Sequence, residues 1–239
     1  MKNTGRKHGV GIFLLMFALS ATGLGILAQQ QPAAKGAAET INFDSAAPGS
    51  LPPGWSIAMT HQGGAPKWDV VKNDTAPSKP NVLAQTSDDA TGGRFPLAIY
   101  DRVSLKDVEI SVKFLPVSGR VDQAAGIVWR YRDQNSYYIV RANALENNVV
   151  LYKVENGRRS SLAPKGTPSN TYGVKHEVPS GKWSTLAVRA QGSVFTVLFN
   201  GKELFQVEDN TFGEAGRTGL WTKADSVTQF DDFTVKPLP

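Results

Sequence analysis

From residue 39 onward the chain consists of short segments in which apolar and polar residues alternate, without the 3.6-residue apolar spacing of a helix. Residues 107–114 alternate throughout, with valine, isoleucine and phenylalanine on one side and glutamate, serine and lysine on the other. Side chains two apart in a strand share a face, so this segment predicts a half-buried strand. The same pattern predicts further strands at 55–59, 68–71, 82–85, 127–132, 137–143, 149–154, 184–190, 194–199, 203–207, 218–223 and 228–235.

The segments between these strands have turn chemistry. Asn156-Gly157 and Asn200-Gly201 predict tight hairpins, because a type I′ turn needs two residues that tolerate positive φ. Neighbouring strands should therefore pair antiparallel. So many short strands do not fit one open sheet without curling or splitting, and we expect an all-β fold, a two-sheet antiparallel jelly-roll sandwich.

The N-terminus has the pattern of a secretory signal peptide. The first eight residues carry the cations Lys2, Arg6 and Lys7 and no acid, and an apolar stretch continues to Ala28. Glycines interrupt this stretch before it reaches the roughly 20 apolar residues of a membrane-spanning helix, although an anchor is the alternative. We expect a signal-peptide helix at 1–28, a flexible leader at 29–40 and one domain at 41–239, secreted or periplasmic, with no membrane span after processing.

Composition excludes several classes of function. The chain has no cysteine, which rules out disulfides, thiolate catalysis and cysteine zinc sites. Its net charge of +5 falls to about +2 once the signal peptide is removed, too little for a nucleic-acid footprint. His61 and His176 stand alone, in no zinc or Ser-His-Asp pattern.

Two stretches carry a family resemblance. Residues 125–148 read AGIVWRYRDQNSYYIVRANALENN and continue as VVLYKVENG, and GKWSTLAVRAQGSVFTVLFNGKELFQVED is followed by GRTGLWTKADSVTQFDDFTV. Together they resemble exported bacterial domains of the concanavalin A-like lectin/glucanase superfamily, particularly the 3-keto-disaccharide hydrolase-like (3-keto-glucoside lyase- or hydratase-like) group, across residues 41–238.

This resemblance implies a concave sheet that faces a glycan and, in some relatives, cleavage or elimination on 3-keto-glycosides, sometimes with a metal. The related family-16 glucanases carry an E-x-D-x-x-E cluster on that face. This sequence has no such triplet, and its nearest acidic strand contains only Asp107 and Glu109.

A polar and aromatic patch is predicted on two neighbouring strands. A guanidinium is not left unpaired in a core, so Arg130 and Arg132 should face solvent or a cleft. Tyr137, Arg141 and Asn143 share one side of the next strand, and a hairpin would join all five side chains. Their fixed donors suit sugar hydroxyls or a uronic carboxylate. Cross-strand ion pairs on an ordinary solvated face are the alternative.

Trp221 is the tryptophan we expect to be exposed, on the same face as Lys223, as a flat surface for a sugar ring. Glu146 and Asp225 are weak candidates for a catalytic pair, since glycosidase carboxylates lie roughly 5–10 Å apart. Glu146 fits a simple turn equally well.

Three acids suggest a calcium site. Asp44 and the pair Asp231 and Asp232 would meet if the first and last strands are neighbours, and clustered carboxylates suit this cation. A surface turn or cap explains Asp231 and Asp232 equally well.

The sequence therefore predicts an exported, monomeric domain that binds a carbohydrate on its concave face, with no cofactor indicated except calcium. One alternative is a glycoside hydrolase or lyase acting on 3-keto-glycosides. Another is a non-catalytic envelope module that binds a protein partner.

Overall fold

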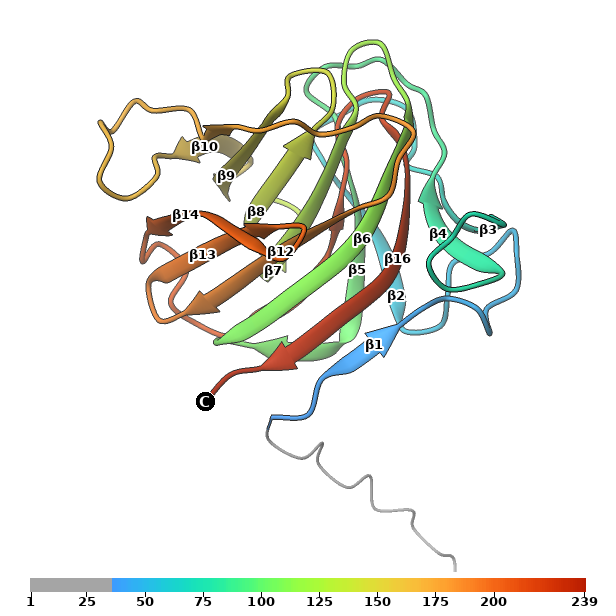
Figure 1. The fold of residues 1–239 in the computed structure, drawn as a ribbon, viewed down its shortest axis with the longest axis horizontal. Helices are drawn as coiled ribbons and strands as arrows, with labels where there is room; N and C mark the ends of the chain where they lie inside the picture. Colours follow the sequence, from blue (N-terminus) through green and yellow to red (C-terminus); the bar gives the residue numbers. More distant parts are fainter. Residues whose placement is uncertain (1–35) are drawn as a thin grey trace, which may run out of the picture. The chain divides into compact units, whose positions relative to one another are not determined.

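Sixteen β-strands form two antiparallel sheets in residues 36–239, the part of the chain described by the computed structural model (Figure 1). These residues contain no helix, and therefore none that could cross a membrane. The predicted all-β sandwich is confirmed. The signal-peptide helix expected at 1–28 lies outside the described residues, and the first strand begins at Glu39, inside the expected leader.

The first sheet has the strand order β14-β13-β12-β6-β16-β4-β3, with β1 beside β16, so the first and last strands are neighbours, the condition set for the calcium site. Its strands are β1 (Glu39–Ile41), β3 (Trp68–Lys72), β4 (Asn81–Gln85), β6 (Val108–Ser118), β12 (Ser184–Gln191), β13 (Val194–Phe199), β14 (Lys202–Glu208) and β16 (Val227–Pro237).

The second sheet has the order β10-β9-β8-β7-β15-β5-β2, with β11 beside β9. Its strands are β2 (Trp55–Thr60), β5 (Phe95–Leu105), β7 (Ala124–Asp133), β8 (Ser136–Asn143), β9 (Asn148–Glu155), β10 (Arg158–Leu162), β11 (Val174–Lys175) and β15 (Gly216–Trp221).

Every predicted strand is present, and the turn chemistry is confirmed. Asn156 and Gly157, with φ of 51° and 80°, join β9 to β10, and Asn200 and Gly201, with φ of 48° and 76°, join β13 to β14. The long strand β5 was not predicted. Its first six residues are all buried, so they read as a continuous apolar run containing a proline rather than as an alternation.

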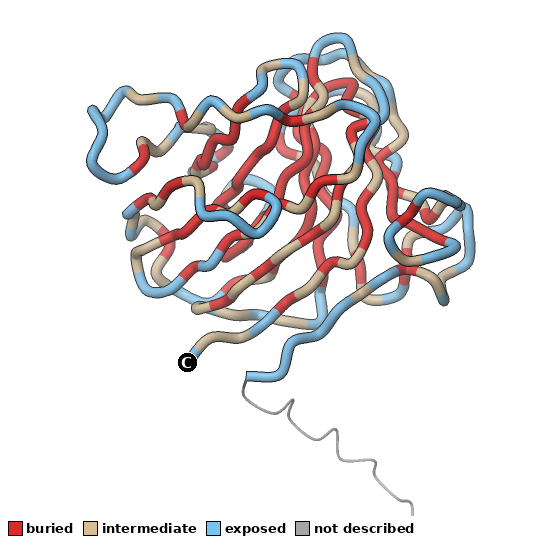
Figure 2. Tube along the Cα trace, viewed as in Figure 1, coloured by how far each residue is buried: buried red, intermediate tan, exposed pale blue. Residues whose placement is uncertain are grey.

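The main core lies between the two sheets. Along β6 the residues predicted to face inward, Val108, Ile110, Val112 and Phe114, are all buried, while the residues between them are only partly covered. Each such side chain stabilises the fold by roughly 1.5–3 kcal/mol through burial. Along β6 and β12 the first sheet therefore has one buried and one solvated face, and Figure 2 shows this alternation.

The second sheet is different because its central strands are buried on both faces. Nearly every residue of β7, β8 and β9 is buried. Alternate residues join the main core, while the others form a second apolar layer on the outer face that includes Val128, Tyr137, Ile139, Val150 and Trp221.

Curling of the second sheet encloses this outer layer. The hydroxyls of Thr60 on β2 and Tyr137 on β8 lie 2.7 Å apart, although four strand spacings separate β2 from β8. In a flat sheet those strands would be about 19 Å apart. A second contact, 2.8 Å from Nε2 of His61 to the carbonyl oxygen of Gly157, ties the end of β2 to the β9–β10 turn. The outer face is therefore concave.

Candidate functional site

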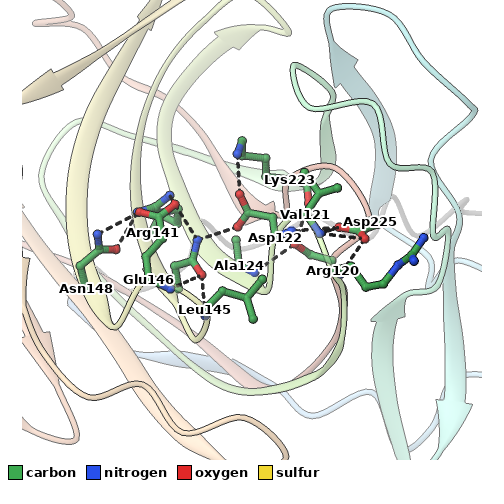
Figure 3. A network of polar contacts seen from close by, with 12 residues as sticks. Arg120, Val121, Asp122, Ala124, Arg141, Leu145, Glu146, Asn148, Lys223 and Asp225 are labelled. Atoms are coloured by element: carbon green, nitrogen blue, oxygen red, sulfur yellow. Dashed lines mark hydrogen bonds and ion pairs between the residues drawn. The ribbon is translucent and has the colours of Figure 1, made fainter.

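A hydrogen-bonded network of charged and amide side chains lies where β7, β8, β9 and β15 meet at one end of the second sheet (Figure 3). Its centre is Arg141 on β8, which is fully buried. Nη1 and Nη2 of Arg141 donate to the two carboxylate oxygens of Glu146 at 3.0 and 2.8 Å, and Nη2 also donates to Asn148 at 2.6 Å. This two-pronged pairing fixes the plane of the guanidinium.

Glu146 belongs to the short β8–β9 loop, which Asn143 shapes. The side-chain oxygen of Asn143 accepts from the backbone N–H groups of Leu145 and Glu146, so the loop folds back toward its own strand. Burial alone would raise the pKa of the Glu146 carboxyl, but hydrogen bonds from Arg141 and Asn148 outweigh burial and hold the pKa below its usual value. Glu146 is thus an anion, and its side chain is 38% exposed.

A second carboxylate, Asp122, joins the network through the amide of Asn143. Nδ2 of Asn143 donates to Asp122 at 2.7 Å and to Glu146 at 3.1 Å. Oxygens that share one donor nitrogen lie within about 6 Å of each other. Asp122 also forms a salt bridge with Lys223, and burial raises the pKa of Asp122 while that salt bridge opposes the rise.

Aromatic rings lie directly beside these polar groups. The guanidinium carbon of Arg141 is 5.6 Å from the centre of the Tyr152 ring and 6.0 Å from that of Tyr172. The two tyrosine hydroxyls are hydrogen-bonded to each other. Tyr172 is 47% exposed, so it presents an aromatic surface to solvent at the network.

The predicted binding patch is therefore present only in part. Arg141 and Asn143 are in the network and Lys223 joins it, while Tyr137 lies fully buried on the same face, its hydroxyl bonded to Thr60. Their role in ligand binding remains a prediction.

Arg130 does not belong to this patch, and its predicted outward orientation is wrong. A β-bulge breaks the β7–β8 register after Trp129, and Arg130 has a φ of 48°. Its side chain turns toward the main core, where it donates to the carbonyl oxygens of Lys106, Phe212 and Gly192. Those acceptors explain how a guanidinium can be buried there.

Arg132 is exposed as predicted but lies away from the network. Its guanidinium carbon is 5.1 Å from the ring centre of Phe212, an inner-core residue. Arg141 pairs with Gly126, six residues from Arg132 along β7, so the two arginines lie at opposite ends of the strand pair.

The prediction that Trp221 is exposed is wrong. Trp221 faces the outer side of the sheet, as expected, but it is fully buried. Phe95 packs against it with a ring-centre distance of 5.2 Å, and the guanidinium carbon of Arg159 lies 5.8 Å from its ring centre. Curling of the sheet brings these covering residues from other strands.

Asp225 holds a loop and is not placed as a catalytic partner of Glu146. Its carboxylate accepts hydrogen bonds from the backbone N–H groups of Arg120, Val121 and Asp122. Burial would raise the pKa of Asp225, but these hydrogen bonds outweigh it and lower the pKa. The carboxylate that does approach Glu146 is Asp122.

The three acids predicted to hold calcium do not come together. Asp231 is buried and accepts from the backbone and hydroxyl of Ser78, while Asp232 pairs with Lys113 and Asp44 accepts from the backbone of Asn81. A bulge after Asp231 turns the two neighbouring aspartates toward different partners. Residues 36–239 contain no group of three or more acids or histidines suited to a metal.

Three residues on or beside the outer face, Asp122, Tyr172 and Arg159, were not identified from the sequence. Asp122 and Tyr172 lie in irregular segments, where period-two reasoning assigns no face. Arg159 is on β10, a short strand that the hydrophobic pattern did not predict. The Asn-Gly turn before it was the only signal that a strand follows.

The fold and this concave, aromatic-lined face define the class, a two-sheet jelly-roll sandwich. The chain belongs to the 3-keto-alpha-glucoside-1,2-lyase-like domain family, whose model matches residues 43–236. None of the curated proteins compared with the chain matches it.

Solved structures share this architecture. The carbohydrate-binding module CBM66 from Bacillus subtilis superposes with a TM-score of 0.58 at 20% identity, covering 77% of this chain and 95% of that one. The cellulose-induced protein Cip1 gives 0.55 at 14% identity, covering 82% and 96%. At these identities the likeness shows a common fold.

Proposed function

We propose that the chain is an exported domain that binds a glycan on the concave outer face of its second sheet, at the Arg141–Glu146 network. The observation that carries the proposal is the set of fixed donors and acceptors around Arg141 beside an exposed tyrosine ring. Sugar hydroxyls both donate and accept, and the C–H face of a pyranose packs on an aromatic ring. The family and the fold shared with a carbohydrate-binding module support this function.

Glycan-array screening followed by calorimetry tests the proposal. Tyr172→Ala removes the exposed ring, and Glu146→Gln removes one acceptor oxygen and the charge; each should weaken binding about tenfold or more, as expected for a central binding contact. Tyr172→Phe is the matched control, since it keeps the ring and should bind within about twofold of wild type. Absence of binding to every glycan, or equal binding by all variants, would refute the proposal.

A second candidate is elimination on a 3-keto-glucoside, favoured by the two neighbouring carboxylates. Burial raises the pKa of Asp122, whereas hydrogen bonds lower the pKa of Glu146. Pairs of carboxyl groups with pKa values shifted in opposite directions are typical of a general acid, here Asp122, and a general base, here Glu146. Glu146 would take the proton from carbon 2, next to the ketone, as the carbon 1–oxygen bond breaks, and Asp122 would protonate the departing oxygen.

Turnover of a 3-keto-α-glucoside, followed by the release of its aglycone, tests this second candidate. Asp122→Asn and Glu146→Gln should each lower kcat by about 100-fold or more, as expected for general acid–base groups. A wild-type rate equal to the uncatalysed rate would eliminate it.

A further inference from the structure

A second surface feature, separate from the network, lies where the curled edges of the second sheet approach each other. It is an open hollow of about 870 Å³, bordered by the end of β2, the β7–β8 turn, the β9–β10 turn and the segment before β5. Its lining residues are His61, Gln62, Gly92, Gly93, Phe95, Gln134, Asn135, Asn156, Gly157, Arg158 and Arg159.

Arg159 is held rigidly at this hollow by aromatic rings. Its guanidinium carbon lies 4.4 Å from the ring centre of Tyr152, 4.7 Å from that of Phe95 and 5.8 Å from that of Trp221. These rings come from three different strands, β9, β5 and β15, which the curl brings together. The guanidinium is therefore preorganised, and little further ordering is needed for it to bind a ligand.

No acidic side chain of residues 36–239 pairs with this cation. Within residues 36–239, Arg159 has neither a salt bridge nor a side-chain hydrogen bond, and its Nη1 is buried without a protein partner. Arg141, in contrast, is paired with Glu146 on the same face of the sheet. A buried charged donor is normally paired, so Arg159 is arranged for an acceptor that residues 36–239 do not supply.

The remaining lining of the hollow reinforces its positive character. Besides Arg159, it contains one arginine and four side-chain amides and no aspartate or glutamate. Both ring nitrogens of His61 face carbonyl oxygens, of Gly93 at 2.7 Å and of Gly157 at 2.8 Å. These two contacts fix the orientation of the imidazole ring at the edge of the hollow.

We propose that this hollow is a subsite for the acidic group of a charged glycan, a carboxylate or a sulfate ester, with Arg159 as its binding residue. Either group offers the oxygens that a guanidinium binds in a fork. The surrounding amides would hold neighbouring hydroxyls. The inference rests on the proposed glycan-binding function, to which it adds the substrate class.

Calorimetry on the full domain with matched oligosaccharides tests this. Tetragalacturonate and its fully methyl-esterified form have the same backbone and differ in charge, and a carrageenan tetrasaccharide supplies the sulfate. Tetragalacturonate, the carrageenan tetrasaccharide or both should bind about tenfold or more tightly than the neutral methyl ester, since hydrogen bonds to charged groups are the strong ones. Comparison of tetragalacturonate with the carrageenan tetrasaccharide shows which acidic group the subsite binds, a carboxylate or a sulfate ester.

Substitution at Arg159 localises the effect. Arg159→Gln should abolish the preference for the charged form and leave binding of the neutral ester within about twofold, whereas Arg159→Lys should keep part of the preference. Arg189→Gln is the matched control, since Arg189 is exposed on β12 of the other sheet and does not line the hollow, and it should retain the preference. Thermal melts confirm that each variant is folded.

The outcomes separate this inference from the proposed function. Equal affinity for charged and neutral forms in the wild type, or a preference that persists in Arg159→Gln, overturns the acidic subsite while leaving glycan binding intact. Retention of the charge preference in Glu146→Gln supports a subsite independent of the network. Failure of the wild type to bind any of these forms overturns the acidic subsite, whereas the proposed function is refuted only if no glycan on the array binds.

Discussion

Substitution of Asp225 by asparagine should destabilise the domain, because it weakens the hydrogen bonds that hold the loop before β7. The carboxylate accepts from three successive backbone N–H groups, at 2.7 Å from Arg120, 3.1 Å from Val121 and 2.9 Å from Asp122. An asparagine keeps one acceptor oxygen, so at least one contact is lost and the others become neutral.

The magnitude follows from these contacts. A hydrogen bond to a charged group contributes about 1.5–3 kcal/mol and a neutral one about 1 kcal/mol. Because the loop is partly exposed, water replaces some of the loss, and the free energy of unfolding should fall by about 2–3 kcal/mol. For a domain of this size that lowers Tm by roughly 5–10 °C.

The effect should depend on pH in a defined direction. Because the pKa of Asp225 is lower in the folded state than the usual Asp value near 3.9, its stabilisation is complete above about pH 4. It disappears as the pH falls through the lowered folded-state pKa. The difference between wild type and Asp225→Asn should therefore be largest at pH 7 and shrink toward pH 2.

Urea denaturation at both pH values measures this difference. Asp133→Asn is the control, because that exposed aspartate accepts a single backbone hydrogen bond, from Asn135 at 2.7 Å, and its loss should cost less than about 1 kcal/mol. A loss below about 1 kcal/mol for Asp225→Asn at pH 7, with an unchanged m-value, would refute the reasoning. So would a difference that does not change with pH.

Two further substitutions probe the second sheet. Gly219→Ala would place a Cβ 2.2 Å from the carbonyl oxygen of Ala98, so it should lower Tm strongly or prevent folding, whereas Gly92→Ala, with nothing within 4 Å, should melt like wild type. Arg130→Met leaves three carbonyl oxygens without their donor and should cost roughly 3 kcal/mol in chemical denaturation. Arg132→Met, at an exposed site, should cost less than about 1 kcal/mol, and equal losses for both arginines would contradict the assigned orientation.

Strand existence was predictable wherever one face meets the core and the other meets water. On β6 the inward series ending at Phe114 follows directly from period-two alternation. The same logic missed β5, because the first half of β5 is a continuous apolar run with no charged residue to mark alternate positions. Strands β8 and β9 are also buried on both faces, but each contains a charged residue, Arg141 and Lys153.

Side-chain direction in the candidate site was predictable only up to the first irregularity. Arg141 and Asn143 face the predicted side because β8 is regular over its length. The bulge at Arg130 reverses the direction of one residue, and no sequence signal for it was evident, since arginine has no special preference for positive φ. Trp221 was assigned to the right face, but its burial depends on residues from distant strands that sequence spacing cannot place.

The curl of the second sheet has a consequence for how relatives of this domain could diverge. Side chains on both faces of β7, β8 and β9 are buried, so a substitution on these strands disturbs either the main core or the outer apolar layer. Turn residues are not packed into either layer, and turns form most of the rim of the hollow around Arg159. Substitutions in these turns can therefore change the ligand preference of such a domain without any change in the strands that support them.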